Sequence, residues 1–323
     1  YSPRVGHDVV AMSKWIEEHI EPGLRVQYQL KKILHTGTSE FQTVDLVELE
    51  PFGRVLMIDG LIQSSQSDEF VYHECLVHPA LLAHPNPKSV YIGGGGEGST
   101  AREVLRHSTV ERCVMVDIDK DVVHFCREHL PENTEAFNDP RLELIIDDAK
   151  AVLEKQAGFD VIIMDLDDPL EGGPCYQLYT TEFYKMIKSK LNPGGIFVTQ
   201  SGAAGIKMHQ TVWSPVHNTL RAVFPSVAAY SQAVYSFLDE WGWNMASSDE
   251  SVMAQLTPQQ VDERIAQRIK GELKFLDGQS YVGIFSLSKQ HRQTLAKETR
   301  VLSLENKSFS FMHSQGLCVA ENK

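Results

Sequence analysis

The chain has 323 residues, of which 42% are hydrophobic and 23% charged, and its formal net charge is −13 at pH 7. This composition is typical of a globular protein long enough for one large domain and a smaller one. The acidic balance argues against tight nucleic-acid binding, and no apolar run approaches the ~20 residues of a membrane helix. The five cysteines form no CxxC pair and the first residues lack the pattern of a signal peptide, so we expect a cytoplasmic protein.

The first part of the chain has the alternation of a β-domain. Short runs of apolar and polar residues predict strands between residues 25 and 72. Asp59-Gly60 lies between two apolar segments and predicts a hairpin turn. Residues 69–82 have helical spacing and are followed by Pro85. We therefore expect a small antiparallel β-domain over residues 1–83.

The remainder, residues 84–323, alternates between strand-like and helix-like segments. Predicted strands lie at 90–92, 113–118, 142–146, 159–164 and 196–199, with two more near 226–235 and 242–247. Helical spacing begins near residues 101 and 122, and recurs at 181–191, 208–222 and 259–270. Such alternation is typical of a mostly parallel sheet covered by helices. The sequence thus predicts an α/β protein with a Rossmann-like domain.

A glycine-rich loop follows the first strand of this domain. Gly93, Gly95 and Gly98 fit the G-x-G-x-x-G pattern between a predicted strand and a predicted helix. Asp117 lies about 20 residues further, at the end of the next strand, where an acid accepts hydrogen bonds from ribose hydroxyls. Glu97 inside the loop would repel a pyrophosphate. The loop therefore favours a cationic nucleoside, such as a sulfonium, over a dinucleotide.

More acids follow later strands. Asp148 follows the third predicted strand, while Asp165, Asp167 and Asp168 follow the fourth. Ligands bind at the carboxyl ends of the strands in open α/β sheets, so these acids are expected to face one crevice. Their mutual repulsion favours a cationic ligand; a Mg²⁺ ion bound through the 165–168 cluster is the alternative. Asp148 is also the best candidate for a helix N-cap.

These features resemble the spermidine synthase family of aminopropyltransferases over most of the chain, from about Tyr28 to Leu295. The similarity is carried by GRVLMIDG at 53–60, by DEFVY at 68–72, and by the glycine loop with Arg102-Glu103-Val104. The resemblance implies an AdoMet methyltransferase-type Rossmann domain. It further implies decarboxylated S-adenosylmethionine as cosubstrate, no permanently bound cofactor or metal, and a homodimer or homotetramer built through the N-terminal domains.

The same resemblance gives roles to individual residues. Asp165 is expected to activate or hold the attacking amine, with Asp168 and Tyr72 beside it. The expected donor-binding residues are Gln42, Gly93, Gly95, Glu97, Asp117, Ile118, Asp148 and Ala149. The expected acceptor-binding residues are Tyr72, His73, Asp167, Asp168, Gln200 and Phe237.

Several positions depart from the commonest family pattern. Residues 165–169 read DLDDP instead of DSSDP, His73 stands where Gln is usual, and Phe237 lies near a usual Tyr. Residues 170–175 form a longer segment, and Trp241 and Trp243 are paired. Together these departures resemble the plant-type thermospermine synthase branch, which implies spermidine as the polyamine acceptor.

Other functions stay open at this level. Spermidine synthesis and spermine synthesis are alternatives. The product isomer stays open because thermospermine and spermine differ only in which end of spermidine attacks. A methyltransferase that uses intact AdoMet is a more distant alternative, since Glu97 would repel the AdoMet carboxylate. A nucleoside-sensing module without chemistry and a dehydrogenase are further alternatives; the first is disfavoured by Asp165, Asp168 and Tyr72 together.

Overall fold

The computed structural model describes residues 14–21, 23–169 and 174–305. Contacts between these residues divide them into two compact units. The N-terminal unit contains the described residues of 14–38 and 42–67. The larger unit contains the described residues of 39–41 and 68–305. The division thus falls between Ser67 and Asp68, whereas the hydrophobic pattern predicts a boundary after residue 83. The reason is that helix α1 (Glu69–Ala83) packs within the larger unit, where its residues 72–83 are buried.

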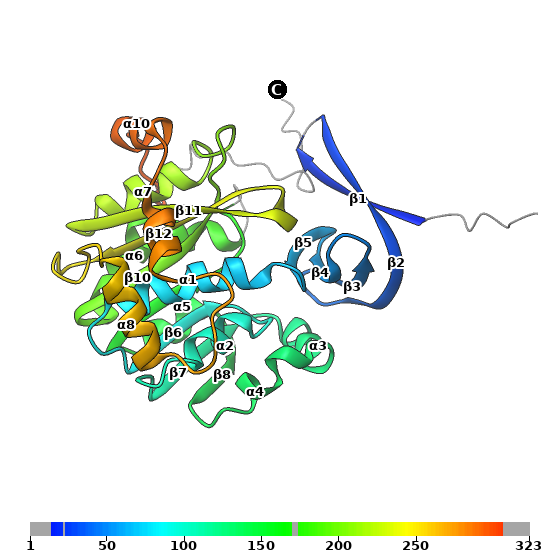
Figure 1. The fold of residues 1–323 in the computed structure, drawn as a ribbon, viewed down its shortest axis with the longest axis horizontal. Helices are drawn as coiled ribbons and strands as arrows, with labels where there is room; N and C mark the ends of the chain where they lie inside the picture. Colours follow the sequence, from blue (N-terminus) through cyan, green and yellow to red (C-terminus); the bar gives the residue numbers. More distant parts are fainter. Residues whose placement is uncertain (1–13, 22, 170–173, 306–323) are drawn as a thin grey trace, which may run out of the picture. The chain divides into compact units, whose positions relative to one another are not determined.

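The N-terminal unit is a five-stranded sheet in sequential order, antiparallel throughout (Figure 1). Its strands are β1 (Lys14–Glu21), β2 (Leu24–Thr38), β3 (Thr43–Leu49), β4 (Gly53–Ile58) and β5 (Leu61–Ser65). Asp59 and Gly60 join β4 to β5 with φ values of 50° and 77°. Positive φ at both central residues is the signature of the type I′ turn, so the predicted hairpin is confirmed.

The larger unit contains a seven-stranded sheet in the order β11-β12-β10-β9-β6-β7-β8 (Figure 1). Its strands are β6 (Ser89–Gly94), β7 (Arg112–Asp117), β8 (Leu142–Ile146), β9 (Phe159–Asp165), β10 (Leu191–Ala203), β11 (Ser226–Val234) and β12 (Asp239–Ser247). Strands β6 to β10 pair in parallel, whereas β12 pairs antiparallel with both β10 and β11. The predicted mostly parallel sheet is therefore confirmed.

Helices cover both faces of this sheet. Besides α1, they are α2 (Ser99–Leu105), α3 (Lys120–His129), α4 (Thr134–Phe137), α5 (Ala149–Glu154), α6 (Thr181–Lys190), α7 (Trp213–Arg221), α8 (Pro258–Arg268), α9 (Gly278–Phe285) and α10 (Lys289–Lys297). Short 3₁₀ turns are η1 (Pro131–Asn133), η2 (Pro174–Tyr179) and η3 (Tyr235–Phe237). One buried core includes residues of α1, α2, α8 and α9, and a second includes residues of α5, α6 and α7.

The central strands are apolar on both faces because each face has its own helical layer. In β6, Val90 and Ile92 belong to the core with α1, while Tyr91 belongs to the core with α5. In β9, Val161 likewise belongs to the core with α1, and Ile162 to the core with α5. Continuous apolar strands are the mark of a parallel sheet buried on both sides. This burial leaves the strand ends and their loops as the places for polar chemistry.

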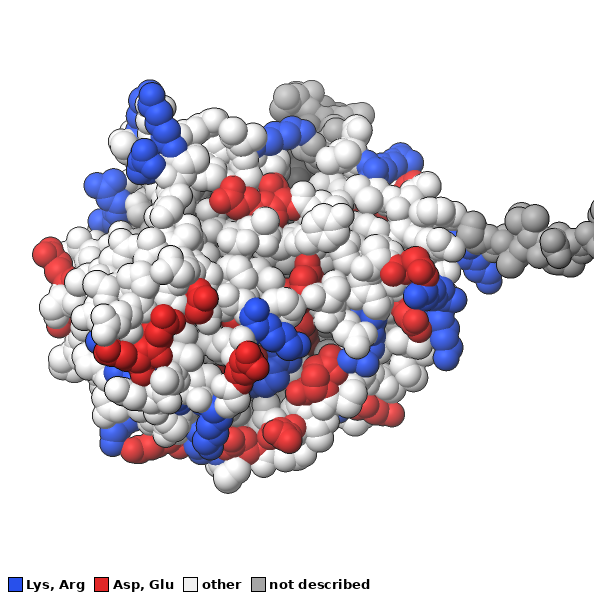
Figure 2. Space-filling view, in the orientation of Figure 1, with Lys and Arg blue, Asp and Glu red and all other residues white. Residues whose placement is uncertain are grey.

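Charged side chains are scattered over the face of the molecule seen in Figure 2. Basic side chains gather over α10, where Lys289, Arg292 and Lys297 are all exposed (Figure 2). Asp and Glu side chains are spread more widely over the same view.

Candidate active site

The glycine loop and Asp165 are joined through the backbone of two central strands. Gly94 at the end of β6 pairs in register with Asp165 at the end of β9, and the Gly95 amide donates to the Asp165 carbonyl at 3.1 Å. A Cβ atom at Gly94 would lie 2.1 Å from that carbonyl oxygen, and the φ of Gly94 is 82°. Only glycine fits there. The loop and the acid are consequently held at a fixed spacing.

Asp165 accepts hydrogen bonds at both carboxylate oxygens from neutral hydroxyls. The Tyr72 hydroxyl donates to Oδ1 at 2.7 Å, and the Thr100 hydroxyl donates to Oδ2 at 2.6 Å. Burial and the nearby Asp165 charge raise the pKa of Tyr72 well above its ordinary value, so its phenol remains a donor. Within the described part of the chain, Asp165 pairs with no Lys, Arg or His. Its carboxylate is thus held in place by neutral hydroxyls and not by a direct ion pair.

Asp168 lies three residues further along, against strand β10. The Gln200 amide donates to Asp168 Oδ1 at 3.1 Å and to the Leu166 carbonyl at 2.5 Å. Burial raises the pKa of Asp168 to about 7, the Gln200 hydrogen bond opposes that rise, and the charge of Asp167 adds to it. The Tyr179 hydroxyl donates to the Asp167 carbonyl at 3.1 Å. Asp168 is therefore an acid that titrates near neutral pH.

Aromatic rings border these two acids. The Tyr72 ring lies edge-on to Phe237, with 5.7 Å between ring centroids, and the same distance separates it from Trp243. Phe237 also contacts Trp241 edge-on at 4.8 Å. The Asp68 carboxylate anchors this region, because it accepts from the backbone amide and the hydroxyl of Ser236, both at 2.7 Å. The result is an apolar wall beside an acidic site, suited to a molecule with methylene chains and positive charges.

Glu97 is held in place within the glycine loop. The Ser99 hydroxyl donates to Glu97 Oε1 at 2.5 Å. The Asn133 amide, which comes from η1, donates to the Glu97 carbonyl at 2.9 Å and to the Ser99 hydroxyl at 3.0 Å. These contacts orient the loop carboxylate, as a ligand-binding acid requires.

An ionic network continues from Asn133 to helix α1. The Arg102 guanidinium donates to Asn133 Oδ1 at 2.9 Å, and one of its nitrogens contacts both Glu69 carboxylate oxygens at 2.9 and 2.7 Å. His73 Nδ1 lies 2.8 Å from Glu69 Oε2. Burial alone would raise the pKa of Glu69, but His73 and Arg102 together lower it to about 2. The network fixes the charged side chains of α1 and α2 next to the glycine loop.

The ends of β7 and β8 carry the other predicted donor residues. Asp117 accepts from the backbone amides of Gly96 and Asp119, both at 2.9 Å, and burial raises its pKa. Ile118 beside it is 51% exposed, which is unusual for a large apolar side chain. Asp148 is the N-cap of α5 and accepts from the Ala151 amide at 2.9 Å, as the sequence analysis predicts.

Most of the predicted residues follow neighbouring strand ends, but some lie elsewhere. Ala149 is buried at the start of α5, and its carbonyl accepts from the Tyr91 hydroxyl at 2.5 Å. Gln42 belongs to the N-terminal unit, just before β3. Residues 170–173 of the longer segment lie outside the described residues. The residues that sequence reasoning missed are Ser99, Thr100, Asn133 and Tyr179; a Ser-Thr pair at a helix start is ordinarily interpreted as capping.

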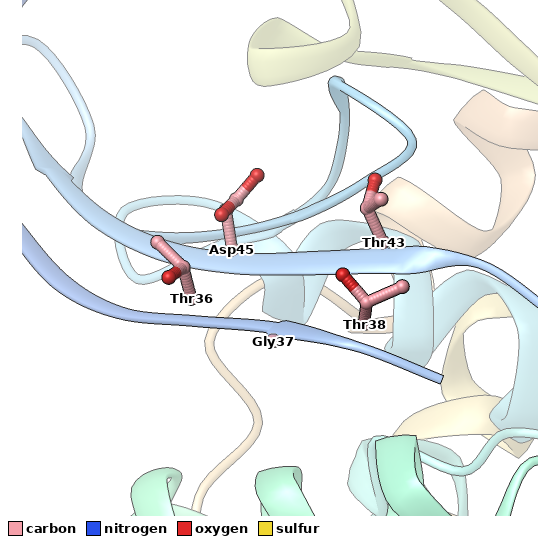
Figure 3. A pocket seen from close by; sticks show the side chains of 5 residues that line it. All are labelled: Thr36, Gly37, Thr38, Thr43 and Asp45. Carbon is pink, nitrogen blue, oxygen red and sulfur yellow. The ribbon is translucent and has the colours of Figure 1, made fainter. Parts of the chain in front are cut away.

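A separate pocket lies on the N-terminal unit between β2 and β3 (Figure 3). It is lined by Thr36, Gly37, Thr38, Thr43 and Asp45. None of these was predicted as a site residue. Over the residues that the structure describes, no group of three or more His, Cys, Asp and Glu side chains has a metal-holding arrangement, and no helix has both the length and the apolarity to cross a membrane.

Comparisons with known proteins agree with this architecture. A spermine/spermidine synthase domain model matches residues 69–257, and a spermidine synthase tetramerisation domain model matches residues 14–66. Thermospermine synthase ACAULIS5 of Arabidopsis thaliana is 52% identical over 305 residues, which cover 94% of this chain and 88% of that protein. A polyamine aminopropyltransferase of Aeropyrum pernix is 43% identical over 299 residues, covering 91% of this chain and 95% of its own length.

Solved structures show the same fold. The spermidine synthase of Thermotoga maritima superposes with a TM-score of 0.79 at 28% identity, covering 89% of this chain and 96% of that one. A spermidine synthase in complex with the transition-state analogue AdoDATO gives a TM-score of 0.80 at 29% identity, covering 88% and 96%. This chain therefore belongs to the spermine/spermidine synthase family of polyamine aminopropyltransferases.

Proposed function

We propose that this aminopropyltransferase moves the aminopropyl group of decarboxylated S-adenosylmethionine onto spermidine, forming thermospermine and releasing methylthioadenosine. The observation that carries the proposal is the state of Asp165. Its carboxylate accepts from two neutral hydroxyls and has no basic side chain hydrogen-bonded to it among the described residues, so it is available to the attacking amine. The 52% identity to a thermospermine synthase supports the choice of acceptor.

The reaction is a direct displacement at carbon. The nitrogen of a neutral primary amine forms a bond to the aminopropyl carbon, the bond from that carbon to the sulfonium breaks, and sulfur leaves with the electron pair as a neutral thioether. An alkyl ammonium has a pKa of about 10.4, so only about one molecule in 10³ to 10⁴ is neutral at pH 7. Asp165 assists either as a base or by holding the amine while its proton passes to water. Alignment of the attack supplies much of the acceleration.

The donor is proposed to lie along the ends of β6, β7 and β8. Glu97 binds the donor's protonated amine, and its fixed orientation supports this role. Asp117 accepts from the ribose hydroxyls while its backbone contacts keep it in place. Exposed Ile118 offers an apolar surface to the adenine, next to Asp148 and Ala149. Gly93 and Gly95 allow close approach of the donor to the backbone. Gln42 is the remaining residue that we propose for donor binding.

The acceptor is proposed to lie against the ends of β9 and β10. Asp168 pairs with an ammonium that does not react, and Gln200 holds Asp168 in place. Exposed Asp167 takes the next positive charge of a longer polyamine. Tyr72, Phe237 and His73 line the remaining side. Phe237 lacks the hydroxyl of a Tyr, so the acceptor meets a purely apolar ring there, which favours the methylene chain of spermidine.

Assembly follows from the N-terminal unit. We propose a homodimer or homotetramer that forms through this unit, because residues 14–66 match a tetramerisation domain model. Analytical ultracentrifugation of the purified protein at micromolar concentration measures the oligomeric state directly.

Identification of the product decides the proposed function. Purified protein is incubated with decarboxylated S-adenosylmethionine and either putrescine or spermidine, and the polyamines are separated against thermospermine and spermine standards. Thermospermine from spermidine, with kcat/KM at least tenfold above that for putrescine, is the expected result. Preferential turnover of putrescine would establish a spermidine synthase, and spermine as product would establish the other isomer.

A further inference from the structure

His73 has a fixed tautomer. Its Nδ1 lies 2.8 Å from the Glu69 backbone carbonyl and 2.8 Å from Glu69 Oε2. Both partners only accept hydrogen bonds, so Nδ1 carries a proton. Arg102 holds the Glu69 carboxylate from the other side with contacts of 2.9 and 2.7 Å. The His73 ring is 3% exposed and lies edge-on to Tyr72 at 5.0 Å. The ring therefore has one orientation, set by α1 and α2.

Three carboxylates from three elements act on the charge of this ring. Glu69 belongs to α1 itself, Glu97 to the glycine loop, and Asp165 to the end of β9, while Arg102 of α2 lies beyond Glu69. Burial opposes a positive charge on His73. The Glu69 hydrogen bond and the charges of Glu97 and Asp165 outweigh burial and raise the pKa of His73 to about 9. The ring is then an imidazolium at neutral pH, and the Tyr72 side chain that it contacts donates to Asp165.

We propose that His73 is a positioning residue whose fixed imidazolium lets the attacking amine settle against Asp165 only in its neutral form. The inference rests on the proposed function, because it assumes an amine at Asp165. An ammonium at that place would face a second cation inside a buried site, whereas a neutral amine would not. A like charge this close lowers the pKa of the bound amine, by roughly one unit in a partly screened site. His73 thereby offsets part of the cost of deprotonating the nucleophile.

The test compares pH profiles of kcat at saturating donor and acceptor, because kcat reports the pKa values of groups in the enzyme–substrate complex. His73→Gln keeps a hydrogen-bonding side chain without the charge. We expect its acidic limb to move about one unit to higher pH, which is an approximately tenfold loss near pH 7. Above pH 9, where His73 of the wild type loses its proton, the two profiles should converge. If the acidic limbs of the wild-type and His73→Gln profiles coincided, the proposal would be overturned.

A matched control and an independent readout complete the design. His124 forms the same i,i+4 pair with Glu128 on exposed α3, at 3.8 Å, so His124→Gln should leave the profile unchanged. Nitrogen-15 NMR of the wild type, with the His73 ring assigned by through-bond correlation to its own backbone, should show an imidazolium at residue 73 through pH 8. A midpoint at or below 6.5 would overturn the proposal even if His73→Gln fails to fold. Turnover of putrescine alone would refute the proposed acceptor, and the same profiles would then be measured with putrescine.

Discussion

Asp168 provides a quantitative prediction about acceptor binding. Burial raises its pKa to about 7, so about one tenth of the protein carries the Asp168 anion at pH 6 and about nine tenths at pH 8. Asp168→Asn has the same shape and still accepts from Gln200, but it carries no charge at any pH. If the anion pairs with an acceptor ammonium, the ratio of wild-type to Asp168→Asn kcat/KM for spermidine should rise roughly tenfold between pH 6 and pH 8.

Initial rates of methylthioadenosine release at saturating donor measure this ratio. Taking the ratio removes the titration of the acceptor amine itself, which affects both proteins equally. Asp121→Asn, a change at an exposed acid of α3, should show no pH dependence relative to the wild type. A ratio that stays constant from pH 6 to pH 8, or that changes only near pH 4, would refute the assignment of Asp168.

The other predictions concern chemistry and stability. Asp165→Asn should lower kcat by roughly 10²- to 10⁴-fold while calorimetry still detects methylthioadenosine binding; unchanged kcat would contradict its role. Glu74 accepts hydrogen bonds from three consecutive backbone amides at 2.8 to 3.0 Å. Glu74→Ala should therefore lower the free energy of unfolding by about 3 kcal/mol or more. Urea unfolding measures this loss, with Glu74→Gln for comparison. Gly98→Ala should cost about 1–3 kcal/mol, because its φ is 93° and a Cβ would lie 2.6 Å from the Phe137 ring. The folded-state pKa of His73 exceeds the ordinary 6.5, so its stabilising contribution is complete below pH 6.5 and is lost as pH rises through about 9. His73→Gln should flatten that part of the curve of unfolding free energy against pH; an unaltered curve would contradict the charged state.

The fold was predictable wherever hydrophobic periodicity was strong. Strands such as 142–146 and 159–164 are apolar runs between turn residues, and the structure has them as β8 and β9. β1 was missed because Trp15 and Ile16 are adjacent and its alternation is weak. α9 was missed because it contains Gly278 and Gly283 among β-branched and aromatic residues. It begins instead with a capping box of Asp277 and Ser280, a local contact that periodicity does not report.

The candidate site was predictable as a set of strand ends, but not as a set of contacts. Asp165 was placed at a strand end because its strand is a clear apolar run. The Thr100 hydrogen bond to it joins residues 65 positions apart, and no spacing rule relates them. Asn133 reaches Glu97 from a short 3₁₀ turn that lacks any helical or strand pattern. Tertiary packing of helix starts and turns decides such contacts, and a single sequence does not encode them in its local pattern.

The backbone pairing of Gly94 with Asp165 has a consequence for how new specificities evolve. The glycine loop and Asp165 follow two adjacent central strands, whereas Phe237 and Trp241 come from η3 and β12 towards one end of the sheet. Substitutions in that outer region alter the surface beside the proposed acceptor without moving the central pair. Descendants of one ancestral enzyme can therefore diversify their acceptors in small steps while the donor chemistry is inherited intact.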